Sequence, residues 1–335
     1  MEISHKTRLD QIDLLRGIAS LAVVLVHYCG LGFLGENSLL TKIFFHGTYG
    51  VHLFFVISGM VIPFSLFNSN YNLNLKDFLK FLLKRFIRIS LPYYVAVLMI
   101  CIQHYLTGYE GPTYKFETAR LLNHFTYTIP FTHFKFFDPV FWSLSIEFQF
   151  YIVIALLYPL VINKNKTIAI ITYFLSLASC LFTFKYSSAL VFHYSPLFIL
   201  GILLFLNHCL LISRTSLYLF SLGAFLICFY HLGVPITLAS IFGFIFIQFS
   251  KFRSKTTSFM GEISYSVYLT HNFFRLFYFI FIAHFMPDLT VPFKLLFMLF
   301  AISLTLFFGW LFYLFVEKPS LYITSLIGKI KWFKN

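Results

Sequence analysis

The sequence predicts an all-α, polytopic membrane protein. Of its 335 residues, 59% are hydrophobic and only 11% are charged, and its mean hydropathy is +0.83. A soluble domain carries about a quarter charged residues, so this chain is too apolar to cover a water-facing surface. The apolar residues also recur along the whole chain, in runs long enough to cross a bilayer as helices.

About ten apolar segments divide the chain, with no internal repeat and no low-complexity linker. They run approximately over residues 12–33, 43–66, 89–107, 139–162, 167–184, 190–207, 216–231, 234–250, 260–283 and 293–316. Most of the 25 Lys and Arg residues fall on the cytoplasmic side if both termini are cytoplasmic, as the positive-inside rule requires. We therefore expect both termini in the cytoplasm and a single integral-membrane domain over residues 1–335, without an appended soluble domain.

The formal net charge of +13 predicts contact with membrane lipids and not with nucleic acid, because the basic residues lie in short loops between apolar segments. Five Cys residues lie within or at the ends of apolar segments without a C-x-x-C spacing, and no H-E-x-x-H pair is present, so no metal is expected. The chain also lacks a Walker-type loop and a G-x-S-x-G elbow. Nucleotide hydrolysis and covalent serine catalysis are therefore disfavoured.

The first apolar segment carries Arg16 and His27, eleven residues apart. Eleven residues make about three helical turns, so both side chains leave one face, about 16 Å apart along the axis. An ionisable group inside a membrane costs about 2.5–3.5 kcal/mol and by default marks a functional site. The pair predicts an anion held at Arg16 and chemistry at His27, with Asp13 as an ion-pair partner of Arg16. The alternatives are a positive-inside anchor for Arg16 and a structural hydrogen bond for His27.

Arg85 and Arg88 lie three residues apart at the start of the third segment, so they are neighbours on a helix. Two guanidinium groups in this arrangement can grip phosphates bidentately. The alternative is a juxtamembrane cluster that contacts lipid head groups.

Glu147 lies about two turns into the fourth segment, after Pro139 at its start. A carboxylate at that depth needs a partner, and an intramembrane His such as His27 is a natural one. A purely structural hydrogen bond remains the alternative for Glu147. Trp142 in the same segment fits an interfacial anchor.

Three other segments carry weaker signals. Ser58-Gly59 allows another backbone to approach closely, which indicates packing. His271 lies deep in the ninth segment, as a functional group or as a structural polar contact. Glu317-Lys318-Pro319 reads as a structural stop after the last segment. The longest outside loop, about 108–138, either covers an acceptor site or simply connects two segments.

Together these motifs resemble membrane-bound acyltransferase family 3, the O-acyltransferases of bacterial surface glycans. The resemblance covers Leu9 to Pro319, and its motifs occur in the family's order. They are R-x10-H at Arg16 and His27, R-x-x-R at Arg85 and Arg88, W-S-L-x-x-E from Trp142 through Ser143 to Glu147, S-Y-S-x-Y-L-x-H from Ser264 to His271, and E-x-P at Glu317 and Pro319.

The resemblance implies an enzyme of the bacterial cytoplasmic (inner) membrane that transfers an acyl group, with acetyl-CoA as the expected co-substrate, to a carbohydrate hydroxyl. It implies His27 as general base or acyl carrier, oriented by Glu147, and donor phosphates on Arg16, Arg85 and Arg88. The remaining motif residues and their neighbours would act in supporting roles: Asp13, Ser58, Trp142, Ser143 and His271.

One position departs from the family pattern, since His52 stands where an acidic residue is usual, before F-F-V-x-S-G. The different-class alternative is a transporter or flippase that uses the same His and Glu as a proton relay. Transporters often contain matched repeats, and this sequence shows none. The sequence predicts no oligomeric state.

Overall fold

The computed structural model describes residues 10–29, 39–108, 117–250, 252, 254–285 and 290–330, without the side chains of Asp10 and residues 276–285. In this part the chain forms helices, turns and loops and contains no strand, which confirms the all-α prediction. The α-helices, in chain order, are α1 (Asp10–Cys29), α2 (Leu39–Phe45), α3 (Gly50–Asn68), α4 (Leu75–Thr107), α5 (Thr118–Phe125), α6 (Trp142–Val161), α7 (Lys166–Ala178), α8 (Ser195–His208), α9 (Arg214–Leu232), α10 (Val234–Phe249), α11 (Lys255–Phe285), α12 (Val291–Phe312) and α13 (Lys318–Ile327).

Short helical turns extend several of these helices. The 3-10 turns that matter for the site are η1 (His46–Tyr49), η2 (Ile129–Phe131), η3 (Pro139–Phe141) and η6 (Val191–Tyr194). A π-helical turn, η7 (Tyr313–Glu317), joins α12 to α13.

Each of the ten predicted segments coincides with helix where the structure describes it. The helices differ in whether their length and hydropathy suffice to cross a membrane. Seven are long and apolar enough to cross a membrane, which supports a multi-pass membrane protein. Lys166–Leu181 and Val234–Phe249 are shorter apolar helices, and α11 is not among the seven. The number of ten crossings therefore stays a prediction. So does the cytoplasmic location of both termini, since residues 1–9 and 331–335 lie outside the described residues.

The predicted boundary of the third segment is wrong for the helix. The predicted segment begins at residue 89, yet α4 begins at Leu75. The helix therefore includes the basic residues before position 89, Arg85 and Arg88 among them. The Asn74 side chain accepts a hydrogen bond from the Asp77 backbone N–H and so caps the helix at this earlier point. Lys and Arg are good helix formers, so the loss of hydropathy before residue 89 does not end the helix.

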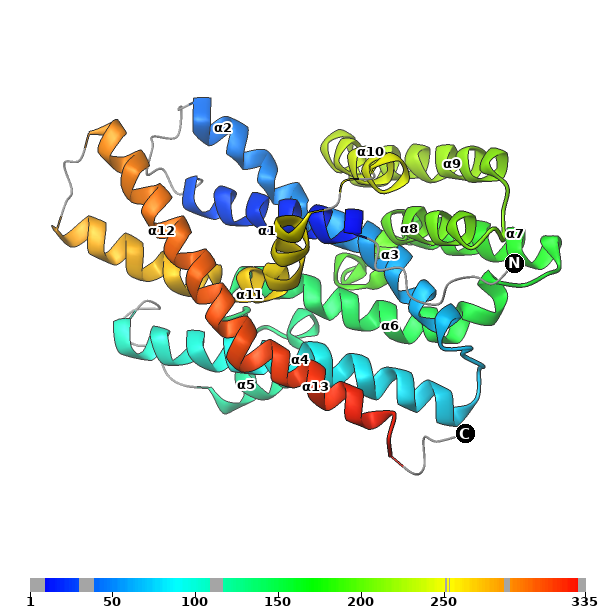
Figure 1. The fold of residues 1–335 in the computed structure, drawn as a ribbon, viewed down its shortest axis with the longest axis horizontal. Coiled ribbons are helices and arrows are strands. Elements are labelled where there is room, and N and C mark those ends of the chain that lie inside the picture. The colour runs from blue at the N-terminus through cyan, green and yellow to red at the C-terminus, as the bar shows by residue number, and fades with distance from the viewer. Residues whose placement is uncertain are drawn as a thin grey trace.

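The long helices run mostly along the long axis of the molecule (Figure 1). α1 packs against α11 and α3, α3 packs against α8, and α4 packs against α13. α1 is therefore flanked by helices from the first and last thirds of the chain, and residues far apart in sequence meet around it.

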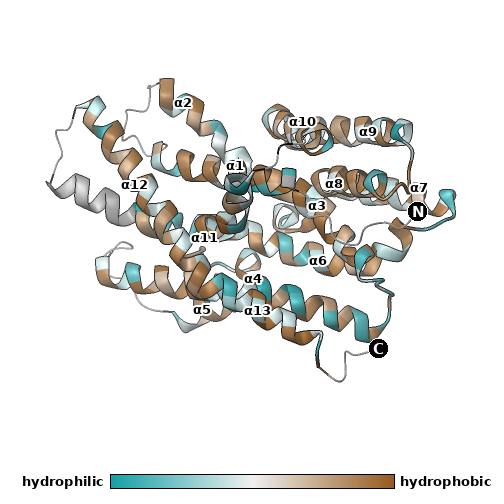
Figure 2. Ribbon diagram, viewed as in Figure 1, coloured by the Kyte–Doolittle hydropathy of each residue, from teal (hydrophilic) through white to brown (hydrophobic). Residues whose placement is uncertain are grey.

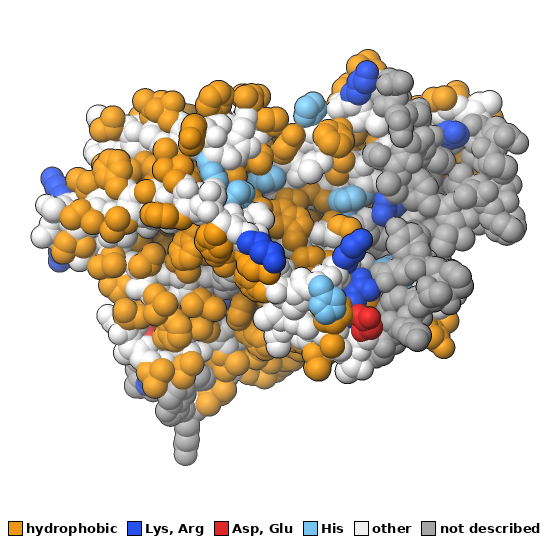
Figure 3. Space-filling view, turned by 180° about the vertical axis from the view of Figure 1, so that it is seen from behind, with side chains coloured by type: hydrophobic (Ala, Val, Ile, Leu, Met, Phe, Trp, Pro, Cys, Tyr) orange, Lys and Arg blue, Asp and Glu red, His pale blue; other side chains and the backbone are white. Residues whose placement is uncertain are grey.

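Apolar side chains cover the outside of the bundle, and polar ones lie within it. Apolar residues dominate most helices (Figure 2) and most of one face (Figure 3), where Lys, Arg and His side chains gather mainly across the middle. Leu106, Leu175 and Leu219 are exposed, whereas Ser264 and Thr305 are buried. Most of the buried core is apolar as well, so it is the large number of exposed apolar side chains that fits a surface solvated by lipid.

Two glycines bring α3 and α8 into close contact. A Cβ atom added to Gly59 would lie 2.1 Å from the Phe198 carbonyl oxygen, and one added to Gly201 would lie 2.1 Å from that of Val56. Small residues at such a crossing allow backbones to approach within a membrane. The packing role expected for the Ser58-Gly59 segment therefore fits this geometry.

Gly201→Ala should destabilise the protein by about 1–3 kcal/mol, because a methyl group would push two backbones apart. Thermal unfolding in detergent would measure the change. Gly328→Ala is the matched control, since the nearest atom to its added Cβ lies at an ordinary 3.6 Å. Equal melting temperatures for both variants would contradict the close crossing.

Candidate active site

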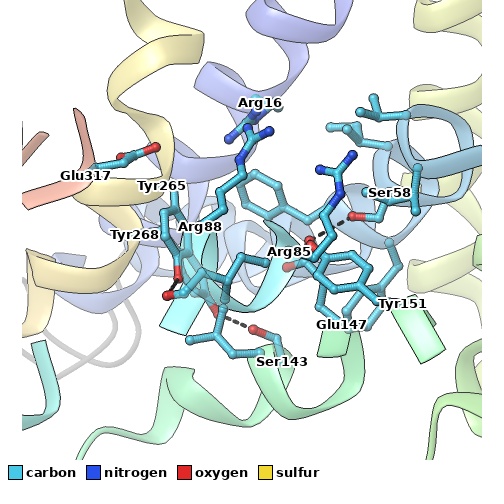
Figure 4. Close-up of a pocket in the computed structure, with 17 residues that line it drawn as sticks. Arg16, Ser58, Arg85, Arg88, Ser143, Glu147, Tyr151, Tyr265, Tyr268 and Glu317 are labelled. Atoms are coloured by element: carbon cyan, nitrogen blue, oxygen red, sulfur yellow. Dashed lines mark hydrogen bonds between the residues drawn. The ribbon is translucent and has the colours of Figure 1, made fainter. Parts of the chain in front are cut away.

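A cavity of about 90 Å³ lies between α1, α3, α4, α6, α11 and η7. Its lining is rich in polar and ionisable side chains for a membrane-embedded bundle (Figure 4). These side chains are Arg16, Ser58, Arg85, Arg88, Ser143, Glu147, Tyr151, Tyr265, Tyr268 and Glu317. Six of the sequence-predicted residues thus meet here, drawn from four helices: Arg16, Ser58, Arg85, Arg88, Ser143 and Glu147.

Three guanidinium groups face this cavity, one from α1 and two from α4. The Arg85 guanidinium carbon lies 5.7 Å from the Phe81 ring centroid and 5.9 Å from that of Tyr151, so two aromatic rings hold it by cation–π contact. The charges of Arg16 and Arg88 interact with each other and with Glu317. This concentration of positive charge suits an anionic ligand.

Glu147 also lines this 90 Å³ cavity, which we call the arginine cavity after its three guanidinium groups. Its Oε1 accepts hydrogen bonds from the Ser58 hydroxyl at 3.2 Å and from the Tyr151 hydroxyl at 2.5 Å. The expectation that Glu147 pairs with His27 is wrong, since Glu147 lines the cavity and His27 does not. The reason is the lateral arrangement of the helices: α6 packs against α3 and α4, whereas α1 turns His27 toward α11.

Glu317 also lines the cavity, although its motif reads in the sequence as a structural stop. It is the last residue of the π-helical turn, and its Oε2 accepts a hydrogen bond of 2.5 Å from the Ser266 hydroxyl. A π turn redirects side chains by widening the helix and often occurs at functional sites. The turn brings this buried carboxylate to the cavity beside Arg16.

A second, wider cavity of about 360 Å³ lies at the N-terminal half of α4 and shares Arg85 and Arg88 with the first. Lys80 and Lys84 add two further cations to its lining, and Thr324 and Ser325 of α13 add hydroxyls. We call this cavity the vestibule. The two shared arginines make the vestibule and the arginine cavity neighbours along one basic wall.

His27 has a different partner, His271 of α11. Nε2 of His271 lies 3.1 Å from Nδ1 of His27, and the two ring centroids are 4.9 Å apart. Nδ1 of His27 lies 2.8 Å from the Val23 carbonyl oxygen, and Nδ1 of His271 lies 2.8 Å from that of Tyr268.

These contacts determine which ring nitrogens carry protons. A carbonyl oxygen only accepts, so each Nδ1 donates its N–H, and Nε2 of His271 acts as an acceptor toward His27. Nε2 of His27 then carries a lone pair, and it makes no hydrogen bond with the described residues. A base oriented by a second group in this way has the arrangement used in acid–base catalysis.

Tyr268 and Ser143 separate the two polar regions. Both line the arginine cavity, and their hydroxyl oxygens lie 2.8 Å apart. The Tyr268 hydroxyl also donates to the Val140 carbonyl oxygen at 2.8 Å, while its backbone carbonyl binds His271. Tyr268 therefore contacts the cavity through its ring and the histidine pair through its backbone.

The other predicted residues lie outside both regions. Asp13 packs where α1 crosses Gly261 of α11, and its charge interacts with Arg16. The Trp142 ring lies 6.4 Å from His52 and 5.4 Å from Tyr194 between centroids, within an aromatic cluster. The unusual His52 thus lies among aromatic rings and does not line the arginine cavity.

The described part of the long loop, residues 117–138, folds against α4. His124 accepts a hydrogen bond from the Phe137 backbone N–H at 3.1 Å and lies 2.9 Å from the Tyr93 hydroxyl. Burial lowers the pKa of His124 to about 3, and the Arg120 charge adds to this. His124 is therefore a neutral acceptor that fixes the end of the loop.

The loop ends at Asp138, whose importance the sequence reading missed. Its Oδ1 accepts hydrogen bonds from the Val140 backbone N–H at 3.0 Å and from the Asn272 amide at 2.8 Å. Burial raises the pKa of Asp138 to about 6, and the nearby Arg275 charge opposes this rise. The only signal in the sequence was its position before Pro139, where it reads as a helix cap.

Comparison with known proteins adds an independent finding. The sequence model of the acyltransferase domain of family 3 matches residues 9–314. No curated protein and no solved structure matches the chain. The match covers well over half of the sequence and includes α1, α4, α6 and α11, which carry the arginine cavity and the histidine pair. The chain therefore belongs to acyltransferase family 3.

Proposed function

We propose that the protein transfers an acyl group from acyl-CoA, with acetyl-CoA as the preferred donor, to a hydroxyl of a cell-envelope or secreted carbohydrate. The observation that carries the proposal is the double role of α1. Arg16 lines the arginine cavity, and about three turns further along the same helix His27 has a free Nε2 beside His271.

The donor side is the basic wall shared by the vestibule and the arginine cavity. The phosphates of CoA bind Arg85 and Arg88, with Arg16 at the inner end. Guanidinium groups bind phosphates through charge-assisted, often bidentate hydrogen bonds. With both termini in the cytoplasm, the orientation that the positive-inside pattern favours, the vestibule would open at the cytoplasmic face of the bacterial inner membrane, where acyl-CoA is available.

Glu147 acts within the donor site and not on His27. Its carboxylate is held by Ser58 and Tyr151, close to Arg85. A carboxylate there limits the repulsion among three nearby guanidinium groups and keeps their side chains oriented before the donor binds.

His27 performs the proton transfer. Its Nε2 removes the proton of the acceptor hydroxyl as the oxygen attacks the thioester carbonyl carbon. The carbon–sulfur bond breaks, and the CoA thiolate leaves and receives the proton from the imidazolium. An ester and free CoA result, and the exchange of a thioester for an ester supplies the driving force. In the alternative mechanism, His27 itself carries the acyl group, and its Nε2 attacks the thioester carbonyl carbon before the acceptor hydroxyl reacts.

Purified protein in nanodiscs with labelled acetyl-CoA tests this function. Label should move to a hydroxyl acceptor with an equal release of free CoA. Movement of a glycan across the membrane without any release of CoA would support the transporter alternative instead.

His27→Ala should lower acyl transfer by about 10²–10⁴-fold, the usual contribution of a general base. Donor affinity should persist, because His27 does not line the arginine cavity. Steady-state transfer and isothermal titration with CoA would measure the two quantities. Full activity in the variant would exclude His27 as the base.

His271→Phe should lower the turnover number by at least about tenfold, because the ring remains but the acceptor for the Nδ1–H of His27 is lost. His231→Phe is the matched control, since His231 makes a similar contact of 3.0 Å with His193 outside the candidate site. If the two variants behave alike, His271 does not orient His27.

Arg85→Ala combined with Arg88→Ala should raise the dissociation constant of CoA by at least about tenfold, because two charge-assisted contacts are lost. Arg214→Ala removes an exposed guanidinium at the start of α9 and serves as the control. An unchanged affinity for CoA in the double variant would remove the phosphate-binding role.

A further inference from the structure

Two buried oxygen atoms near the histidine pair have no hydrogen-bond donor in the described part of the chain. They are Oδ2 of Asp138 and Oδ1 of Asn272. The exposed fractions of these residues are only 2% and 7%. An unsatisfied buried acceptor costs about 1–3 kcal/mol, so two neighbouring ones indicate a place built to receive donors from a ligand.

The other atoms of the two side chains are already engaged. The Asn272 amide nitrogen donates to Oδ1 of Asp138, which also accepts the Val140 N–H. Both side chains are therefore fixed by bonds between η3 and α11. The pair presents acceptors only, one carboxylate oxygen and one amide oxygen.

Asp138 and Asn272 lie in the same region as His27. Asn272 follows His271 directly on α11, and one turn later Nη1 of Arg275 donates to the His27 carbonyl oxygen at 3.4 Å. The charge of Arg275 interacts with Asp138 as well as with both histidines. Arg275 thus contacts the His27 backbone and interacts electrostatically with Asp138, which links the two places.

The pair is also separate from the donor site. Neither Asp138 nor Asn272 lines the arginine cavity or the vestibule. Tyr268, which lines the arginine cavity, bonds to Val140, two residues after Asp138. The orphan oxygens therefore lie outside the donor cavity, and Val140 connects Asp138 to Tyr268 at its edge.

We propose that Asp138 and Asn272 form the acceptor subsite, where they bind hydroxyl groups next to the one that His27 deprotonates. The inference rests on the proposed function and adds the chemistry of the acceptor. A hydroxyl donates one hydrogen, so an alcohol that satisfies both oxygens through its hydroxyls carries at least two further hydroxyls close to the reacting one. Such a ligand is a polyol or a pyranoside, not a simple alcohol.

The test uses the full chain in nanodiscs with labelled acetyl-CoA and a graded set of acceptors: water, methanol, glycerol and methyl α-glucopyranoside. The measured quantity is the ratio of kcat/KM for the glucopyranoside to that for methanol. In the wild type this ratio should exceed about tenfold, since each hydrogen bond to a buried or charged acceptor contributes about 1.4 kcal/mol or more.

Asp138→Asn and Asn272→Ala should each lower this ratio about tenfold, while the affinity for CoA stays unchanged. Asp138→Asn keeps the helix cap, because Asn caps as well as Asp does. Asn123→Ala removes a half-buried, hydrogen-bonded amide of α5 away from the histidine pair and is the matched control, with an unchanged ratio. CoA binding shows that each variant is folded.

The remaining outcomes distinguish a failure of the proposed acyl transfer from a failure of the acceptor subsite. A wild type that neither binds CoA nor cleaves acetyl-CoA overturns the proposed function and the subsite with it. A wild type that hydrolyses acetyl-CoA but shows no preference for the polyols over methanol overturns the subsite alone. The acceptor subsite is also overturned if the kcat/KM ratio for the glucopyranoside over methanol is equal in the wild type, Asp138→Asn and Asn272→Ala.

Discussion

The contact between α1 and α11 is the interaction on which both functional regions depend. Ionisable groups in an apolar medium must find their partners within the chain, and α1 carries two of them on one face. At one end of this contact Arg16 meets the cavity that also holds Glu317, and at the other end His27 meets His271. Gly261 lets the two helices approach so closely that an added Cβ would lie 2.5 Å from that of Asp13. The register between α1 and α11 therefore sets the positions of His27 and Arg16 together.

The histidine pair illustrates how an apolar setting can orient an imidazole through neutral groups and without a carboxylate partner among the described residues. In many catalytic dyads a carboxylate orients the imidazole, but burial of a charge is costly unless it is fully compensated. Here two backbone carbonyls, of Val23 and Tyr268, fix both Nδ1–H groups, and a neutral His271 accepts from His27. The carboxylate that the sequence suggested for this role, Glu147, lies instead among three guanidinium groups, where its charge is compensated. Glu147 therefore lies with the three guanidinium groups of the arginine cavity, whereas Arg275 is the charged neighbour of the histidine pair.

Spacing along single helices could be predicted from the sequence, and contacts between helices could not. Hydropathy identifies the helical segments, and the i, i+3 rule places Arg85 and Arg88 side by side. The three-turn interval likewise puts Arg16 and His27 on one face of α1. Which of several deep polar residues faces His27 depends on lateral packing of the helices. The sequence does not distinguish Glu147 from His271 as the partner of His27, and the prediction of Glu147 is wrong. Tyr151, Tyr268 and Asp138 were missed because a tyrosine or a helix-capping aspartate in a sequence has common structural uses. Glu317 was misread because a π turn, which no simple periodicity announces, brings it to the cavity.

The separation of the donor cavity from His27 has a physical consequence for catalysis. Water in contact with both an activated thioester and a free base would hydrolyse the donor, and enclosure of a reactive group prevents such side reactions. Tyr268 is buried and is held by contacts with Ser143 and Val140, so it closes the arginine cavity on the side of the histidine pair. Under the proposed function, a thioester that passes Tyr268 would displace these contacts, and binding of the CoA phosphates far from the reacting carbon would supply the free energy. The proposed function therefore couples donor binding on Arg85 and Arg88 to access to His27, and under it a donor without the nucleotide portion would lose turnover and not only affinity.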